Sequence, residues 1–224
     1  PASLGLLTKL QTLELWINQL TGTNLDVLSQ LTSIKYLDLV ACKLSGELPD
    51  SISQLTNLEY LNLGQNQLSG SIPESISQLV NLKKLRLYNN QLTGVPDSLG
   101  LLTGLVWLDL GGNLLSGSFL ESIIKLTNLQ LLGLDRNQFT GLIPESIRML
   151  QNLNYLYLDN NQFTGSIPES IGQLQNLEYL LIDDNQFTGP IPVSIGSLQN
   201  LKYLYLDNNQ FSGPLPESLG LLQN

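Results

Sequence analysis

The chain contains no histidine, and among its 224 residues there is a single cysteine, Cys42. Without histidine there is no Ser-His or Cys-His nucleophilic pair and no histidine-based metal site. One cysteine excludes an internal disulfide, so the cysteine content indicates no redox compartment. These absences argue against the common kinds of catalysis. We therefore expect a protein that is not an enzyme and that uses no cofactor and no metal.

Basic residues and long apolar runs are also scarce. Ten lysines and arginines stand against 19 acidic residues, which gives a net charge of −9 and an isoelectric point of about 4.3. Nucleic-acid binding needs clustered positive charge, so this balance argues against it. No apolar run approaches the roughly 18 residues that a membrane span requires. The chain also has no Asn-x-Ser/Thr sequon for N-glycosylation.

What the chain has in abundance is one repeated unit. Residues 150–173, LQNLNYLYLDNNQFTGSIPESIGQ, recur almost unchanged at 174–197 and again at 198–221. Looser copies begin at positions 7, 31, 55, 79, 102 and 126, so the step is 24 residues with one step of 23. A fixed period of this size predicts a solenoid in which each unit buries its apolar face against its neighbours.

The ends of the chain are predicted to lack the polar caps of a complete solenoid. The chain opens within one unit and ends just inside another. We therefore expect residues 1–224 to form a single domain that is part of a longer array. The leucines expected to face water at its two ends are Leu4, Leu6, Leu7, Leu219, Leu221 and Leu222.

Each unit follows the spacing L-x-x-L-x-L, and its last two leucines predict a short strand with one buried face. Next comes an asparagine such as Asn161, whose amide can pair the buried backbone groups of successive turns. Cys42 takes this position in the second unit, as a buried filler rather than a reactive thiol. The following T-G-S-I-P predicts a positive φ at glycine, then a short 3-10 or α turn with Pro168 at its N1 position.

Units four and five depart from the pattern. Unit four is one residue short, and unit five has Leu120 where the other units have proline. The simplest account is that the regular C-terminal units arose by recent duplication. A local change of curvature at the irregular units is the alternative.

The pattern L-x-x-L-x-L-x-x-N-x-F-T-G-x-I-P resembles the plant-specific class of leucine-rich repeat over essentially the whole chain. Receptor-kinase ectodomains and polygalacturonase-inhibiting proteins carry repeats of this class. The resemblance implies an α/β fold, a right-handed solenoid of about nine 24-residue repeats. A parallel sheet would line its concave side, and short 3-10 or α turns its convex side. The resemblance also implies a protein or peptide partner and an extracellular or cell-surface location, which the missing sequons do not support.

Residues between the strand leucines are predicted to line the concave face, where solenoids commonly bind partners. Every tyrosine and tryptophan falls on this face, whereas four of the five phenylalanines fall in an outer spine. Tyrosine and tryptophan suit a half-wet binding surface and are enriched at binding hot spots. A ladder that only stabilises neighbouring strands is the alternative. The predicted partner-binding residues are Tyr36, Tyr60, Tyr88, Trp107, Asp109, Asp135, Tyr155, Tyr157, Asp159, Tyr179, Asp183, Tyr203, Tyr205 and Asp207.

Four of these residues, Asp135, Asp159, Asp183 and Asp207, form an acidic column along one edge of the face. Carboxylates about 5 Å apart repel by about 1 kcal/mol in water, so we expect raised pKa values in this column. The column would select basic groups on a partner, or it is a solvated turn residue copied with the repeat. Calcium is a weaker hypothesis, because no loop gathers six oxygens. The first half of the face is mixed to basic, with Lys35, Lys83, Lys84 and Arg86.

The sequence therefore predicts a recognition module that binds a protein or peptide. The alternative is a carbohydrate-binding module that uses the same tyrosine and tryptophan columns. The carboxylate spacing of about 5 Å also matches a retaining glycosidase, but the repeat itself imposes that spacing. Ice binding by the outer strip, which carries Thr140, Thr164 and Thr188, is a further hypothesis.

Overall fold

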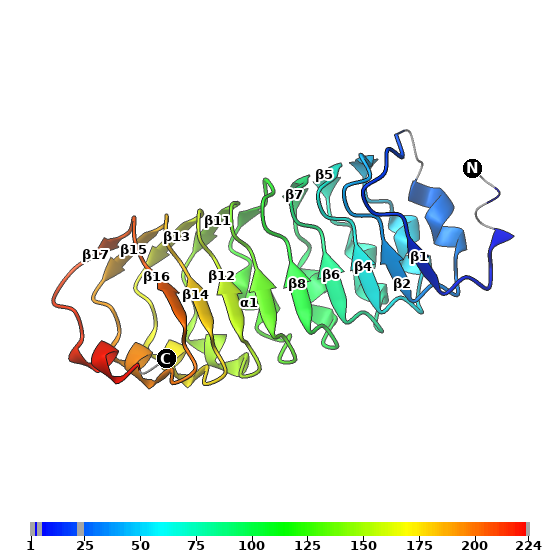
Figure 1. Ribbon diagram of the computed structural model, residues 1–224. Helices are drawn as coiled ribbons and strands as arrows, with labels where there is room; N and C mark the ends of the chain where they lie inside the picture. Colours follow the sequence, from blue (N-terminus) through cyan, green and yellow to red (C-terminus); the bar gives the residue numbers. More distant parts are fainter. Residues whose placement is uncertain (1–2, 4–5, 22–24, 223–224) are drawn as a thin grey trace.

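A computed structural model describes residues 3, 6–21 and 25–222 of the chain. The chain winds into a curved solenoid, with the first strand, β1 (Thr12–Glu14), and the last, β17 (Gln210–Phe211), at opposite ends (Figure 1). The right-handed α/β solenoid predicted from the repeats is confirmed. Among the described residues, no helix is long and apolar enough to cross a membrane.

The concave side is one parallel sheet, to which the described residues contribute nine three-residue strands. Each strand pairs with the equivalent strand of the next repeat, so equivalent residues form straight columns across the sheet. The central leucine is buried in every strand except the two edge strands. After β1 the strands are β2 (Tyr36–Asp38), β4 (Tyr60–Asn62), β6 (Lys84–Arg86), β8 (Trp107–Asp109), β10 (Leu131–Gly133), β12 (Tyr155–Tyr157), β14 (Tyr179–Leu181) and β16 (Tyr203–Tyr205).

An asparagine ladder follows this sheet, as predicted. Asn66 Oδ1 accepts hydrogen bonds from the backbone N–H groups of Cys42 and Leu44, both at 3.0 Å. Its Nδ2 donates to the carbonyls of Leu39 and Leu63, both at 2.9 Å. Each amide thus joins its own turn to that of the preceding repeat. Equivalent pairs of bonds occur at Asn90, Asn113, Asn137, Asn161, Asn185 and Asn209.

Cys42 is a fully buried filler in this ladder, also as predicted. Its thiol donates to the Leu15 carbonyl at 2.9 Å. The Leu20 N–H donates to the Cys42 backbone carbonyl at 2.9 Å, whereas the equivalent N–H of Leu44 donates to an asparagine side chain. Lys43 adopts a φ of +58°. A backbone carbonyl therefore substitutes for the missing amide oxygen, with a local change of chain direction.

Among the described residues, strands of the outer spine form two lateral sheets, one of three strands and one of five. They are separated where unit four is one residue short, and the pairing already shifts register at Gly70/Ser71. The irregular units thus interrupt the lateral pairing without interrupting the concave sheet. The three-stranded sheet contains β3 (Ser45–Glu47), β5 (Gln67–Ser71) and β7 (Gln91–Gly94). The five-stranded sheet contains β9 (Ser116–Gly117), β11 (Gln138–Gly141), β13 (Gln162–Gly165), β15 (Gln186–Gly189) and β17.

Stacked phenylalanines fill the spine behind the five-stranded lateral sheet. The rings of Phe139 and Phe163 stack with centroids 6.4 Å apart, and the stack continues to Phe211. The prediction that only four phenylalanines belong to the spine was wrong. Phe119 also stacks, 5.9 Å from Phe139, because it occupies the position that isoleucine takes in other repeats.

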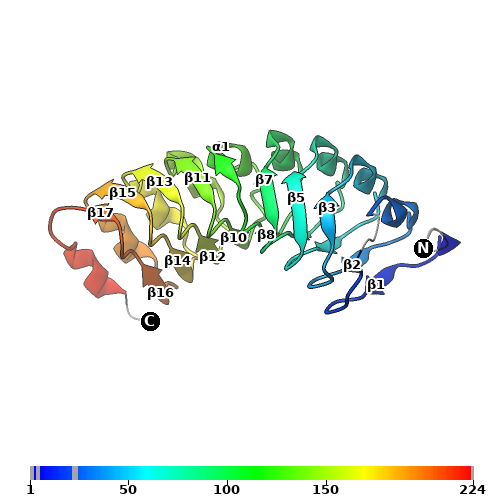
Figure 2. The same cartoon turned by 90° about the horizontal axis from the view of Figure 1, so that it is seen from above.

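The convex side consists of short turns, mostly 3-10 helices, as Figure 2 shows along the outer edge of the arc. The prediction that proline takes the N1 position was wrong. Pro168 is the N-cap, with φ −72° and ψ 146°, because the turn closes when Ile171 N–H donates to the Pro168 carbonyl at 3.0 Å. The turns are η2 (Leu25–Gln30), η3 (Asp50–Gln54), η4 (Glu74–Gln78), η5 (Asp97–Leu101), α1 (Leu120–Ile123), η6 (Glu145–Met149), η7 (Glu169–Gln173), η8 (Val193–Ser197) and η9 (Glu217–Leu221).

The leucines near the two ends only partly meet expectation. Leu6, Leu7 and Leu221 are exposed. Leu219 and Leu222 are half-buried and pack against the core, so the prediction that they face water was wrong. Leu4 lies outside the described residues.

Candidate functional site

The first column of the concave face carries most of the aromatic side chains. Tyr36 and Tyr60 stack with ring centroids 4.1 Å apart and an interplanar angle of 5°. Further along, Tyr179 lies 4.9 Å from Tyr155 and 4.4 Å from Tyr203. The parallel register places these rings side by side on neighbouring strands. The result is an N-terminal aromatic pair (Tyr36 and Tyr60) and a separate, larger C-terminal aromatic cluster.

The C-terminal aromatic cluster begins at Trp107. Trp107 and Tyr155 stand on strands that flank β10, yet their ring centroids are only 6.3 Å apart. Leu131 of β10 lies between them in the column and is only 6% exposed. We infer that the two rings lean together over this leucine. The concave face is therefore partly closed at its centre by aromatic side chains.

The second column adds Tyr157 and Tyr205. Tyr157 meets Tyr155 and Tyr179 edge to face, with centroids 6.2 and 6.4 Å apart, and burial raises its pKa to about 12. Trp107, Tyr155, Tyr157, Tyr179 and Tyr203 together make the C-terminal aromatic cluster. Tyr203 and Tyr205 are exposed by 43% and 49%, so the cluster is most open at its C-terminal edge.

A cationic group lies between the two aromatic groups. Lys84 Nζ sits 5.3 Å from the Trp107 ring centroid, and the Arg86 guanidinium carbon sits 4.9 Å from that of Tyr88. Arg86 also reaches Asp109, with a nitrogen–oxygen distance of 3.5 Å. Burial raises the pKa of Asp109, and the nearby Arg86 charge offsets part of that rise. Tyr88 and Asp109 are thus in contact with basic side chains rather than with the acidic column.

The acidic column stands at the ends of strands β10, β12, β14 and β16. Burial raises the pKa of Asp135 to about 6, and the negative charges of Asp159 and Asp109 add to the rise. The expected upward shift is confirmed for Asp135, but burial is its largest cause. One Asp135 carboxylate oxygen lies 2.4 Å from where a Cβ on Gly111 would be, so the missing side chain of Gly111 makes room for this carboxyl.

The rest of the column is unevenly paired. Asp159 is only 9% exposed and accepts a hydrogen bond from Asn160 Nδ2 at 3.1 Å. Burial also raises the pKa of Asp183, and its Oδ1 is buried without a hydrogen-bond partner in the described part of the chain. Asp207 is exposed. Within the described residues no group of three or more carboxylate, cysteine or histidine side chains could hold a metal ion.

The predicted site residues omitted several polar side chains of the same columns. Asp38 and Asn62 are buried at the foot of the N-terminal aromatic pair. Asn62 Nδ2 donates to Asp38 Oδ2 at 3.1 Å, and the Tyr60 hydroxyl lies 3.3 Å from the same oxygen. Column position alone could have identified both residues. Their burial could not be read from the sequence, because it depends on how the tyrosine rings fold over them.

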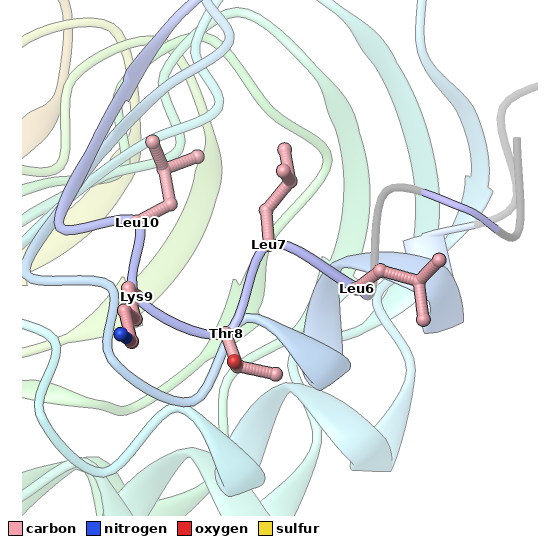
Figure 3. A pocket seen from close by; sticks show the side chains of 5 residues that line it. All are labelled: Leu6, Leu7, Thr8, Lys9 and Leu10. Carbon is pink, nitrogen blue, oxygen red and sulfur yellow. The ribbon is translucent and has the colours of Figure 1, made fainter.

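Three surface hollows are among those that the described residues form. One of about 480 Å³ lies at the N-terminal end, lined by Leu6, Leu7, Thr8, Lys9 and Leu10 (Figure 3). Another of about 510 Å³ lies between the outer loops of units three and four. A third of about 350 Å³ lies against the N-terminal aromatic pair and is lined by Lys35, Tyr36, Glu59, Tyr60, Lys83 and Lys84. Of these three, the last coincides with predicted site residues.

Solved structures with the same fold include plant receptors. The ectodomain of the Arabidopsis thaliana receptor kinase GASSHO1/SCHENGEN3, in complex with CASPARIAN STRIP INTEGRITY FACTOR 2, is 39% identical with a TM-score of 0.97. The match covers 100% of this chain and 27% of that one. The Arabidopsis receptor kinase HAESA, in complex with the peptide hormone IDA and the co-receptor SERK1, is 36% identical with a TM-score of 0.90, covering 95% and 36% of the two chains.

A plant ice-binding protein is also similar. It is 29% identical, with a TM-score of 0.84, and the match covers 96% of this chain and 70% of that one. No curated protein sequence matches the chain significantly. The family model for the leucine-rich repeat region matches residues 1–140 and 107–224, which together span the chain. The chain therefore belongs to the leucine-rich-repeat family, and its repeats are of the plant type seen in receptor-kinase ectodomains.

Proposed function

We propose that the chain is a recognition module that binds a peptide or an extended protein segment along its concave face. The observation that carries this proposal is the segregation of aromatic side chains. All eight tyrosines and both tryptophans lie in the concave columns, whereas the phenylalanines fill the spine. Packing alone does not require this division, because phenylalanine would fit a purely structural ladder as well as tyrosine does.

The shape of the face supports an extended ligand. The aromatic rings and carboxylates run in straight columns across the strands. Tyrosine and tryptophan bury a large area on a partner with little loss of side-chain entropy. The acidic column would attract and orient basic groups of the partner. We therefore place the contact residues among the fourteen columnar residues predicted from the sequence.

Related structures support the same function. The GASSHO1/SCHENGEN3 and HAESA ectodomains were solved with a bound factor and a peptide hormone, respectively. This chain spans only 27% and 36% of those receptor chains. We therefore propose a peptide partner for it by similarity. On the same basis we propose an extracellular or cell-surface location, and binding rather than catalysis.

Peptides selected from a random display library on the immobilised protein would test the proposal. Tyr179→Ala should weaken such a peptide by about 2 kcal/mol or more if Tyr179 is a hot spot. Asp183→Asn should slow association and flatten its salt dependence, because this carboxylate attracts basic groups of the partner. Gln186→Ala, on an exposed lateral position, is the control. If both concave variants bind like the parent, the concave face is not the site.

A carbohydrate ligand for the same columns is the main alternative outcome. Sugar rings stack on tyrosine and tryptophan without needing charge, so a neutral polysaccharide would retard the protein in affinity gels regardless of salt. Retardation that is lost in Tyr179→Ala, together with no selected peptides, would favour this alternative over peptide binding.

Ice binding is a second candidate function, for the five-stranded lateral sheet rather than the concave face. Thr140 pairs with Gln162, and Thr164 with Gln186, so hydroxyl and amide side chains alternate along an uncharged strip. Thr140 and Thr188 are exposed. A regular array of this kind could order water, and the similar plant protein is an ice-binding protein.

Ice recrystallisation measured at equal protein concentration would test the second candidate. Replacing Thr140, Thr164 and Thr188 together with lysine should abolish inhibition, because the charges disrupt the uncharged array. Tyr179→Ala on the concave face is the matched control and should leave inhibition unchanged. If ice crystals grow as fast in the presence of the parent protein as in the presence of albumin, ice binding is excluded as a function.

A further inference from the structure

We propose that the partner is dipolar, with an acidic segment held by a lysine patch (Lys35, Lys83 and Lys84) and a basic segment held by the acidic column. This inference rests on the proposed function and adds a chemistry and a direction to it. It assigns an anion-binding subsite to the N-terminal part of the concave face, which the predicted site residues did not include.

The lysine patch surrounds a hollow of about 350 Å³. Tyr36 and Tyr60 form one wall, stacked with an interplanar angle of 5°. Lys35 directly precedes β2, Lys83 directly precedes β6, and Lys84 is the first residue of β6. Strand β4 lies between these two strands. Flat rings beside flexible ammonium groups form a surface on which an acidic side chain can lie with its stem on the rings and its carboxylate among the lysines.

Positive charge in the patch is left over after internal pairing. Lys35 pairs with Glu59 at 3.2 Å. The side chains of Lys83 and Lys84 take part in no ion pair or hydrogen bond with the described residues, and the Lys84 ammonium contacts only the Trp107 ring. Three lysines against one glutamate give the hollow a formal charge of +2. In a chain with a net charge of −9, such a local excess favours an anionic ligand.

Two buried donors extend the patch toward the centre of the face. Arg86 Nε and Trp107 Nε1 are buried without hydrogen-bond partners in the described part of the chain. Arg86 lies 6.0 Å from the Trp107 ring, so the two N–H groups belong to one neighbourhood. Buried donors are nearly always paired, and leaving one unpaired is unfavourable. An acceptor oxygen from the ligand would satisfy them.

The far side of the face has the opposite charge. Strand β10 separates the two regions with a buried Leu131 and with Gly133, neither of which carries charge. The acidic column starts at the end of this strand with Asp135 and continues to β16, and within it Asp183 Oδ1 is a buried acceptor without a donor in the described part of the chain. Lys202, the basic residue directly before β16, already forms an ion pair with Glu178 at 2.8 Å. A basic segment of the ligand would supply the missing donors.

The distance between the two regions selects the kind of ligand. Between four and five strand spacings separate their midpoints, which is about 22 Å, or about six to seven residues of extended chain. A peptide with an acidic and a basic segment meets both regions at once. A uniformly anionic polymer, such as a polyuronate, would be repelled by the acidic column, and a uniformly basic one by the lysine patch. Charge complementarity therefore favours the dipolar peptide.

The test uses synthetic peptides and the whole chain in a Trp16→Phe background, where Trp107 alone reports by fluorescence. Hexaglutamate should bind and change Trp107 emission, and Lys83→Gln with Lys84→Gln should weaken it about ten-fold or more. Lys43→Gln with Lys125→Gln is the charge-matched control and should not. Calorimetry should show that hexalysine binds, and that Asp159→Asn together with Asp183→Asn lowers its affinity about ten-fold. Glu121→Gln together with Glu145→Gln is the charge-matched control and should leave this affinity unchanged.

A block peptide of three glutamates and three lysines, joined by a neutral spacer, tests the direction. It should bind about ten-fold or more tighter than either block alone, with an optimum at a spacer of a few residues. Hexalysine binding without hexaglutamate binding, or hexaglutamate binding that ignores Lys83 and Lys84, overturns the inference and leaves the proposed function standing. Oligogalacturonate that binds the patch better than hexaglutamate overturns it in favour of a glycan. If no peptide of any kind responds to Tyr179→Ala, the proposed function itself fails.

Discussion

At the scale of the single residue, Asn161 shows how much one side chain can hold together. Its amide takes part in four hydrogen bonds with backbone groups of its own turn and the preceding repeat. Asn161→Ala should lower the free energy of unfolding by about 1–3 kcal/mol, because it leaves those backbone groups unpaired away from water. Chemical denaturation measures the change. Gln162→Ala, an exposed neighbour on β13, is the control, and equal midpoints for the two variants would contradict the role assigned to the ladder.

Ile17 is a second residue whose local geometry makes a prediction. It has a φ of +55°, is 69% exposed and stands in a column where Asn89, Asn160 and Asn208 adopt the same left-handed conformation. A β-branched residue is disfavoured there by about 1–2 kcal/mol, whereas asparagine tolerates it. Ile17→Asn should therefore raise the unfolding free energy by about 1 kcal/mol. Thermal melts would show it, and Val193→Asn, an exposed β-branched site in η8, should give no gain.

At the scale of the element, strand β10 and the turn after it place Asp135 against Gly111. The folded chain raises the pKa of this carboxyl from 3.8 to about 6, chiefly by burial. A raised pKa means that the folded state binds the proton more tightly than the unfolded state. The contribution of Asp135 to stability is therefore greatest below about pH 4 and is lost as the pH rises through about 6.

Asp135→Asn should remove this pH dependence. The variant should exceed the parent by about 1–2 kcal/mol in unfolding free energy at neutral pH, and the difference should shrink toward pH 4. Asp159 and Asp109 add to the effect and Arg136 opposes it, so all three are kept unchanged. Urea denaturation at a series of pH values is the measurement, with Asp50→Asn on the convex side as the control for losing one charge. A variant curve parallel to that of the parent would contradict the burial of this carboxyl.

The sequence predicts the register of the concave strands, but it does not predict the side-chain arrangement on them or the register of the lateral strands. The 24-residue period set the column register, since a parallel pairing of equal units has one consistent alignment. It could not place Leu131 under two neighbouring rings, because that depends on rotamers of residues one strand away on either side. Nor could it show that Thr140 pairs with Gln162, a step of 22 residues, since the slant of the lateral strands sets that register. The contact residues themselves remain predictions.

At the scale of the whole molecule, acidic side chains form a second row on the convex side. Each of the short convex helices begins with an acidic residue in its first turn, except η8, where Val193 takes that position. Ser51 and Ser75 each donate a hydrogen bond to the acid of the preceding repeat, at 2.6 and 2.9 Å. The row comprises Asp26, Asp50, Glu74, Asp97, Glu121, Glu145, Glu169 and Glu217.

Two rows of like charge at the repeat period, in a chain of net charge −9, predict that salt stabilises the solenoid. Folding brings these carboxylates into line, and unfolding relieves their repulsion. Raising potassium chloride from about 0.02 to 0.5 M shortens the screening length from about 20 Å to about 4 Å, so the melting temperature should rise by about 2–4 °C. Because salt also acts on apolar surface, the deciding quantity is a difference between proteins measured in the same salt. Asp159→Asn with Asp183→Asn should show a smaller rise than the parent. Lys43→Gln with Lys125→Gln, which changes the net charge by the same amount in the opposite direction, should show a larger rise. Equal salt responses in all three proteins would mean that the aligned carboxylates do not limit the stability of the fold.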